Sequence, residues 1–184
     1  MIIYGHYKEV AKSENQGRKA VFFIGSTIGN LLPLECDKFL HEVASCLKSG
    51  DLMLIGFDLI KSPQTIIDAY TLGPNEAFYK NILERINNQL EGNFDLDNFE
   101  HYFSYNPING LGATFLISKK EQKVRIEACE SEVFFQPWEQ IHISFHQKYN
   151  TKNIKELAEK VGFEVIHSFY DSQKYFSDSI WRLK

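Results

Sequence analysis

The sequence predicts an α/β fold in which helices pack on a mostly parallel sheet, and three patterns support this prediction. Residues 20–24 (AVFFI) and 52–60 (LMLIGFDLI) are continuous apolar runs, which is typical of buried strands. A helical spacing of apolar residues lies between them. The middle of the chain has a strand, turn and strand pattern, and the C-terminal residues form a helical pattern followed by two strand-like runs. We therefore expect one α/β core that carries an α+β insertion.

The first strand-like run leads into a loop, residues 25–30 (GSTIGN), that contains two glycines. Pro33 opens the helical segment, and Gly50 is expected to cap its C-terminal end. The run 52–60 lacks polar alternation, so we expect a central strand covered by helices on both faces. Ligands of such a right-handed βαβ unit bind beyond the carboxyl ends of its strands, where loop 25–30 and Asp58 lie.

The middle of the chain, residues 73–133, is predicted to form the α+β insertion, which could build a lid over a substrate. Apolar residues at four-residue steps indicate a helix in its first part. Residues 101–105 and 113–118 have strand-like patterns, and Asn109-Gly110 between them is a hairpin signal. The predicted division is therefore a partial core, the insertion, and a closing part with a pocket strand, at residues 1–72, 73–133 and 134–184.

Composition limits the classes of function. The chain has 184 residues, of which 43% are hydrophobic and 14% aromatic, enough to bury one sizeable core. Its formal net charge of -4 comes from interspersed acids and bases, which argues against binding nucleic acid or an anionic membrane surface. Neither a signal peptide nor an apolar run of membrane-spanning length is apparent. Cys36, Cys46 and Cys129 follow no metal or disulfide spacing, so we expect buried, reduced thiols in a cytoplasmic protein without a metal site.

Several motifs follow one another along the chain: Gly5-His6-Tyr7, FFIGSTIGN at 22–30, Asp58-Leu59 with Tyr70, Phe99-Glu100-His101, and Ile141-His142 with Lys148-Tyr149. Together they resemble the histidine-specific, S-adenosylmethionine-dependent methyltransferases that begin ergothioneine synthesis. The resemblance covers nearly the whole chain. It implies a Rossmann-like class I methyltransferase fold, S-adenosyl-L-methionine as cofactor, and methylation of the amino group of an amino acid, histidine or a related substrate.

The resemblance implies substrate roles for five residues. Asn30 and Tyr70 correspond to family residues that hold the α-amino and carboxylate end of the amino acid, with Gly25 beside them. Tyr70 is also the candidate catalytic base. Family members that bind histidine place a Glu and a Ser against the imidazole, where this chain has Ser144 and His146. A hydroxyl bonds an imidazole more weakly than a carboxylate does, so a different amino acid or a related amine is an alternative substrate, and this polar strand face either lines a pocket or meets water.

The resemblance also implies five cofactor-binding residues. His6 and Tyr7 stand where the family has an Asp-Phe pair that flanks the adenine. Tyr7 can still stack on a purine, whereas His6 supplies no carboxylate. Gly25, Ser26 and Thr27 are expected to border the methyl donor.

The fold implied by the resemblance begins with a strand, a glycine-rich turn and a helix that hold the cofactor, and these have no counterpart in the sequence. We therefore expect strand 20–24 to present an apolar sheet edge. A homodimer partner or a separate N-terminal fragment would cover that edge, unless the chain is a truncation. The alternative function is that of a non-catalytic binding or regulatory subunit derived from such an enzyme. A nucleotide-binding or hydrolytic protein is disfavoured, because Walker and nucleophile-elbow motifs are absent.

Overall fold

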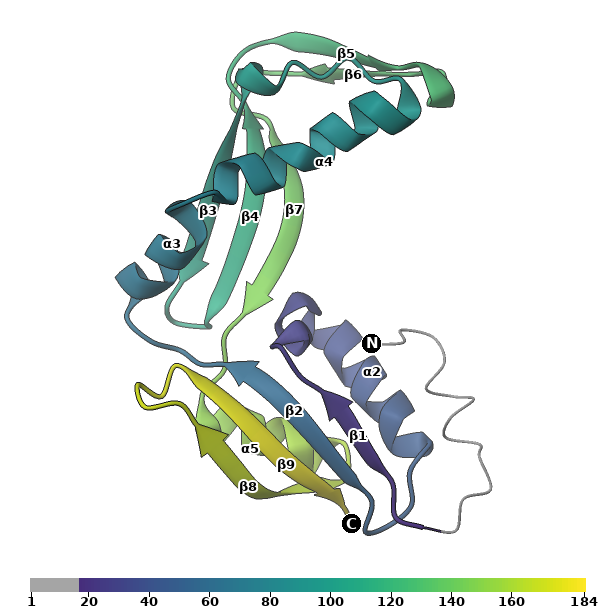
Figure 1. Cartoon of the computed structure of the whole chain (residues 1–184), viewed down its shortest axis with the longest axis vertical. Coiled ribbons are helices and arrows are strands. Elements are labelled where there is room, and N and C mark those ends of the chain that lie inside the picture. Colours follow the sequence, from purple (N-terminus) through teal and green to yellow (C-terminus); the bar gives the residue numbers. More distant parts are fainter. Residues whose placement is uncertain (1–16) are drawn as a thin grey trace. The chain divides into compact units, whose positions relative to one another are not determined.

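The computed structural model describes residues 17–184, which form two compact units. Unit one contains residues 17–61 and 145–184 of the described chain, and unit two is Ser62–Ser144. Unit two therefore includes the predicted insertion together with flanking segments on both sides. Figure 1 labels the α-helices and strands of unit one. The elements of this unit are β1 (Ala20–Phe23), η1 (Thr27–Asn30), α2 (Pro33–Ser45), β2 (Leu52–Asp58), α5 (Thr151–Lys160), β8 (Phe163–Tyr170) and β9 (Phe176–Leu183).

The sheet of unit one has the strand order β1-β2-β9-β8. β1 and β2 are parallel, with Ala20 opposite Leu52 and Phe23 opposite Ile55. β9 pairs antiparallel with β2 on one side and with β8 on the other. The predicted strand–helix–strand unit and the antiparallel closing strand are both confirmed. Because β1 and β2 are parallel, their carboxyl ends meet at one edge of the sheet.

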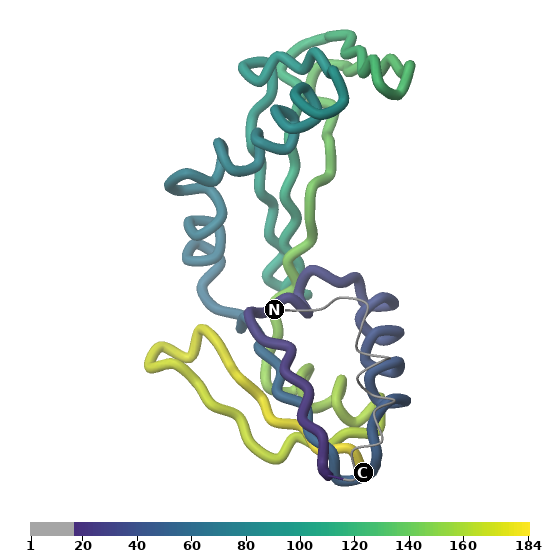
Figure 2. Tube along the Cα trace, turned by 45° about the vertical axis from the view of Figure 1, so that its right-hand side comes forward, coloured from purple at the N-terminus to yellow at the C-terminus, as the bar shows by residue number. Residues whose placement is uncertain are grey.

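One face of this sheet carries the core of unit one. The inward side chains of β2 are Met53, Ile55 and Phe57, all fully buried, and they pack with Trp181 of β9. Buried residues of both α2 and α5 belong to the same cluster. Within the described residues, α2 and α5 cover one face of β2, and Figure 2 shows both helices along the Cα trace. A helix on the other face of β2 stays a prediction.

The helix α2 begins as predicted and ends earlier than predicted. Pro33 occupies its first turn, where a missing N–H costs nothing, and the Glu35 carboxylate accepts the Leu32 N–H at 2.9 Å. The helix ends at Ser45, four residues before the turn that contains Gly50. Gly50 has φ 90 and serves this turn before β2. It is not the helix cap, because the turn is closed by Asp51, whose side chain accepts the Lys48 N–H at 2.9 Å.

β1 lies at the edge of the described sheet, as the sequence predicted. Its partner among the described residues is β2, on one side. Phe22 alternates with the inward residues Val21 and Phe23, and its side chain is 65% exposed. Ile24, which follows the strand, is 48% exposed. β1 is therefore an edge strand of the described sheet with exposed apolar side chains at its end.

Unit two is built on a three-stranded sheet with the order β3-β4-β7 and a separate hairpin of β5 and β6. The predicted hairpin turn is confirmed: Gly110 has φ 72, and the Asn109 side chain accepts the Leu111 N–H at 3.0 Å. Its elements are α3 (Pro63–Thr71), α4 (Asn75–Leu90), η2 (Leu96–Asn98), β3 (Phe99–Asn106), β4 (Leu111–Ser118), β5 (Gln122–Ile126), η3 (Glu127–Cys129), β6 (Ser131–Phe135) and β7 (Gln140–Gln147), the last of which continues into unit one.

The core of unit two lies between α4 and the sheet. Tyr79 and Leu83 of α4 pack in one cluster with Phe99 of β3 and Leu116 of β4. Tyr79 and Leu83 are four residues apart on the helix, and Ile141 and Ile143, which pack against the same cluster, are two residues apart on β7.

The three cysteines differ in exposure. Cys36 is buried in unit one, Cys46 is half-buried and Cys129 is exposed. The expectation of burial is therefore confirmed for Cys36 and wrong for Cys129, which lies on the short turn η3 between two hairpin strands. Within residues 17–184, no helix has the length and apolar character needed to cross a membrane.

Substitution of the two tryptophans tests whether the cluster around Trp181 stabilises unit one. Trp181 is fully buried and its ring stacks on Phe57 at 5.8 Å, so Trp181→Ala should lower the free energy of unfolding by about 3–5 kcal/mol. Trp138 is 67% exposed, so Trp138→Ala is the matched control and should change the free energy of unfolding by less than about 0.5 kcal/mol. Urea unfolding followed by circular dichroism measures both. Equal effects of the two substitutions would contradict this core.

Candidate functional site

The loop that follows β1 turns sharply at the carboxyl end of the parallel strand pair. Gly25 and Ser26 both have positive φ, 78 and 53. Such backbone is rare for serine and is typical of loops whose position the surrounding structure fixes. The chain then makes the single 3-10 turn η1, in which Gly29 N–H donates to Ser26 carbonyl at 2.9 Å. Asn30 ends this turn with an exposed side chain.

A glycine in β2 allows the loop to lie close to the sheet. At Gly56, a Cβ would lie 3.1 Å from the Gly25 nitrogen and 2.8 Å from the Phe176 ring. Any other residue at this position would therefore push against the loop backbone. The side chain of Asp178, 3.2 Å from the same point, completes the surroundings of Gly56. The start of loop 25–30 thus depends on Gly56 for its place above the strand ends.

The second glycine of the loop has a different neighbour. At Gly29, a Cβ would lie 2.6 Å from the carbonyl oxygen of Gln147, at the end of β7. This distance excludes every side chain, and Gly29 is buried. The backbone of Gln147 is therefore in direct contact with loop 25–30.

Tyr149 contacts the same loop from inside the core. Its ring packs edge-on against Phe57 at 5.0 Å, and its hydroxyl donates a long hydrogen bond of 3.5 Å to the Ile28 carbonyl. Burial raises the pKa of the Cys36 thiol to about 11, with the side-chain hydrogen bond between Cys36 and Tyr149 acting in the opposite direction. Burial also raises the pKa of Tyr149. Both groups therefore keep their protons near neutral pH, and Tyr149 remains a donor to the loop.

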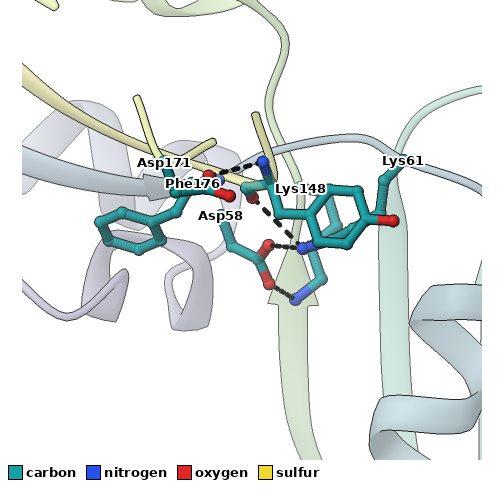
Figure 3. Close-up of polar contacts among 6 residues, drawn as sticks. Asp58, Lys61, Lys148, Asp171 and Phe176 are labelled. Atoms are coloured by element: carbon teal, nitrogen blue, oxygen red, sulfur yellow. Dashed lines mark hydrogen bonds and ion pairs between the residues drawn. The ribbon is translucent and has the colours of Figure 1, made fainter. Parts of the chain in front are cut away.

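A charged cluster lies where β2 ends. Figure 3 shows the carboxylate of Asp58 between two lysines, with Lys61 Nζ at 2.6 Å from Oδ1 and Lys148 Nζ at 2.6 Å from Oδ2. The Lys148 side chain is 4% exposed, against 16% for Lys61. Lys61 also donates to the Tyr175 carbonyl at 3.2 Å and lies 4.8 Å from the centre of the Tyr175 ring. Two cations thus share one anion at the edge where ligands bind in this type of sheet.

The hairpin between β8 and β9 supports this cluster. Asp171 accepts hydrogen bonds from the backbone N–H groups of Tyr175 and Phe176, each at 2.7 Å, and Figure 3 includes the second of them. The N–H of Phe176 is the main reason that the pKa of Asp171 lies below its ordinary value. These bonds fix the backbone of Tyr175, which in turn receives Lys61.

The structure assigns the predicted site residues to both units. Gly25, Ser26, Thr27 and Asn30 form one continuous loop in unit one, and half-buried His146 lies in the same unit at the end of β7. Tyr70 and Ser144 are half-buried residues of unit two. His6 and Tyr7 lie outside the described residues.

Within unit two, Tyr70 and Ser144 lie on opposite faces of the sheet. The ring of Tyr70 stacks on Phe103 of β3 at 4.3 Å. Phe103 pairs with the residue before Phe115 of β4, so Phe103 and Phe115 face opposite sides. His142 of β7 contacts Phe115 at 5.4 Å, and Ser144, two residues further, shares the face of His142. That Tyr70 and Ser144 contact one substrate stays a prediction.

Sequence reasoning placed Asp58 at the ligand-binding edge and did not foresee its two lysines. Lys61 is three residues after Asp58, the last residue of β2. An acid and a base this close together after an apolar run could have indicated their ion pair. Lys148 is 90 residues from Asp58, and no local pattern connects them. The contact of Gln147 with Gly29 is equally non-local.

The chain is similar in sequence to known proteins over nearly its whole length. A family model described as "Histidine-specific methyltransferase, SAM-dependent" matches residues 2–183. The histidine N-alpha-methyltransferase of Mycolicibacterium smegmatis is 35% identical over 97% of this chain and 56% of that protein, and that of Mycobacterium tuberculosis is 30% identical over 95% and 54%. The L-tryptophan methyltransferase trpM of Psilocybe serbica is 27% identical over 85% of this chain and 44% of that protein. The chain thus spans about half the length of the curated relatives it matches.

The match extends almost from end to end of the chain, so the family resemblance carried by loop 25–30 and the later motifs is confirmed. The predicted Rossmann-like methyltransferase fold is confirmed with it, since the parallel pair β1 and β2 and the antiparallel β9 have the expected order. The chain belongs to the S-adenosylmethionine-dependent, histidine-specific methyltransferase family.

Proposed function

We propose that the protein transfers a methyl group from S-adenosyl-L-methionine to the amino group of an amino acid. The observation that carries this proposal is loop 25–30, fixed above the carboxyl ends of two parallel strands with Asn30 exposed. In open α/β sheets this is the edge at which ligands bind. The relatives named above are methyltransferases, which lends no support to a non-catalytic subunit. The reduced cysteines are compatible with a reaction in the cytoplasm.

The described residues fit one side of a cofactor site. A Cβ at Gly25 would meet open space, and Ser26 and Thr27 follow at the turn. These residues would border the reactive end of the cofactor. When bound, S-adenosylmethionine supplies an electrophilic methyl group on a sulfonium. His6 and Tyr7, which lie outside the described residues, are the candidates on the adenine side.

The protein's own task in this reaction is to orient an uncharged amine. The Asn30 amide offers a donor and an acceptor, which suits the carboxylate and the amino group of an amino acid. Tyr70 is held flat against Phe103, so its hydroxyl has few alternative positions. We assign Tyr70 the roles of holding the amino group and, as the phenolate, of accepting its proton.

Asn30 provides the first test. Asn30→Ala removes hydrogen bonds to charged groups of the substrate and should lower kcat/KM about 100-fold, mainly through KM for the amino acid. Mass spectrometry of methylated product, with a panel of amino acids as substrates, gives the rates. Asn88 is an exposed residue of α4 and Asn88→Ala is the matched control, which should leave the rates unchanged. An Asn30→Ala protein as active as the wild type would contradict the assigned role, and a wild type that methylates no amino acid would contradict the function.

We propose that residues of β7 determine which amino-acid side chain of the substrate is recognised. Ser144 and His146 replace the Glu and Ser that the family resemblance associates with histidine binding. Ser144 offers a neutral hydroxyl in place of a carboxylate, which weakens the contact with an imidazole. We propose that the preferred substrate is an amino acid other than histidine or a related amine.

A double substitution tests this specificity. Ser144→Glu combined with His146→Ser should raise kcat/KM for histidine about tenfold relative to the original substrate, because a charge-assisted hydrogen bond replaces a neutral one. His146→Ser alone is the control, since it removes the imidazole without adding a carboxylate. Competition assays with two amino acids in one mixture measure the ratio. An unchanged ratio in the double variant would exclude these positions from the specificity pocket.

The open edge of β1 supports a further proposal about assembly. Phe22 and Ile24 expose apolar surface on a strand that, among residues 17–184, pairs on one side only, a combination that favours pairing with another strand. We propose that a strand from a second polypeptide segment, either another copy of the chain or an N-terminal fragment, adds to β1 and supplies the remaining cofactor contacts.

Light scattering after size-exclusion chromatography tests the assembly. The purified chain should self-associate, and Phe22→Lys should shift it toward the monomer, because a charge on an edge strand opposes pairing. Leu34 is 83% exposed outside the sheet, so Leu34→Lys is the control and should leave the distribution unchanged. A wild-type chain that is monomeric and fully soluble at high concentration would contradict the proposal.

A further inference from the structure

We propose that Gln147, Lys148 and Tyr149 form a brace that positions the loop carrying Asn30. This inference rests on the proposed function, because it gives the loop its purpose. All contacts of the brace described below lie within unit one. The three residues touch loop 25–30 on one side and the end of β2 on the other, so they connect two segments that are far apart in sequence.

The backbone of the brace is attached to the end of β2. Tyr149 N–H donates to the Asp58 carbonyl at 3.0 Å, and Ile60 N–H donates to the Tyr149 carbonyl at 2.8 Å. Tyr149 and Leu59 form a parallel bridge through these bonds. The brace therefore continues the sheet hydrogen bonding beyond the last residue of β2.

Two contacts transmit this attachment to the loop. The Gln147 carbonyl oxygen lies 2.6 Å from the position that a Cβ of Gly29 would take, and the Tyr149 hydroxyl donates to the Ile28 carbonyl. The second bond is long, 3.5 Å, so we expect the tight backbone contact at Gly29 to contribute more. Asn30 is the next residue after Gly29, so a shift of the brace displaces Asn30 directly.

Lys148 fixes the brace through Asp58. The Lys148 side chain is 4% exposed, so removing it breaks a buried ion pair, whereas Lys61 on the same carboxylate is 16% exposed. Breaking a buried pair has a larger effect than breaking an exposed one. Because Lys61 remains on Asp58 in a Lys148 variant, the carboxylate is not left without a cation. Lys148 is thus assigned the role of a positioning residue.

Hydrogen exchange measured by mass spectrometry tests the brace without requiring activity. Lys148→Met should speed exchange of the amides in residues 27–31 about tenfold, because the loop loses its support. Lys61→Met is the matched control: it removes the other lysine from Asp58, does not alter the brace, and should leave exchange of this loop unchanged. Exchange in β2 and β9 should stay slow in both variants, which shows that unit one remains folded.

Enzyme kinetics then separate positioning from simple loss of stability. Lys148→Met should raise KM for the amino acid about tenfold and leave KM for S-adenosylmethionine unchanged, and Lys148→Arg should restore most of the loss. If the wild type shows no methyl transfer, the proposed function fails, and loop exchange still decides on the brace. If loop exchange is the same in Lys148→Met and wild type, the brace is wrong whatever the activity.

Discussion

The placement of β2 between β1 and β9 is the constraint on which the rest of unit one depends. Its inward residues hold α2 and α5 on one face through a cluster around Phe57 and Trp181. Its last residues belong to the candidate site. Gly56 allows the loop after β1 to lie close to the strand, and the Asp58 carboxylate forms ion pairs with two lysines. One strand therefore links the core, the loop and the charged cluster, so a change in its register would displace all three.

Packing and charge have separate roles at this edge. The loop is held by close backbone contacts at Gly25 and Gly29, where no side chain fits or where φ is positive. Such contacts are independent of pH and salt. The ion pair of Lys148 with Asp58 adds to these contacts, because it fixes the chain segment that touches the loop. Since Lys148 is almost fully buried, its pair is screened less by salt than an exposed pair would be.

Local sequence patterns predicted most elements because their causes are local. Apolar runs gave β1 and β2, the Asn109-Gly110 pair gave the hairpin, and Pro33 gave the helix start. Two expectations failed: Gly50 serves a local turn closed by Asp51 and is not the cap of α2, and Cys129 is exposed on η3 rather than buried. The contact between Gln147 and Gly29 and the pair of Lys148 with Asp58 could not be predicted, because they join segments about 90 residues or more apart that only the folded sheet brings together.

The central claim is that loop 25–30 binds the α-amino and carboxylate groups of an amino acid beside a methyl donor. Calorimetric titration of the protein with L-amino acids in the presence of S-adenosylhomocysteine measures this binding directly. We expect that at least one L-amino acid binds, and that its decarboxylated amine and its N-acetyl derivative bind far more weakly. Equal binding of these derivatives, or no binding of any amino acid, would contradict it.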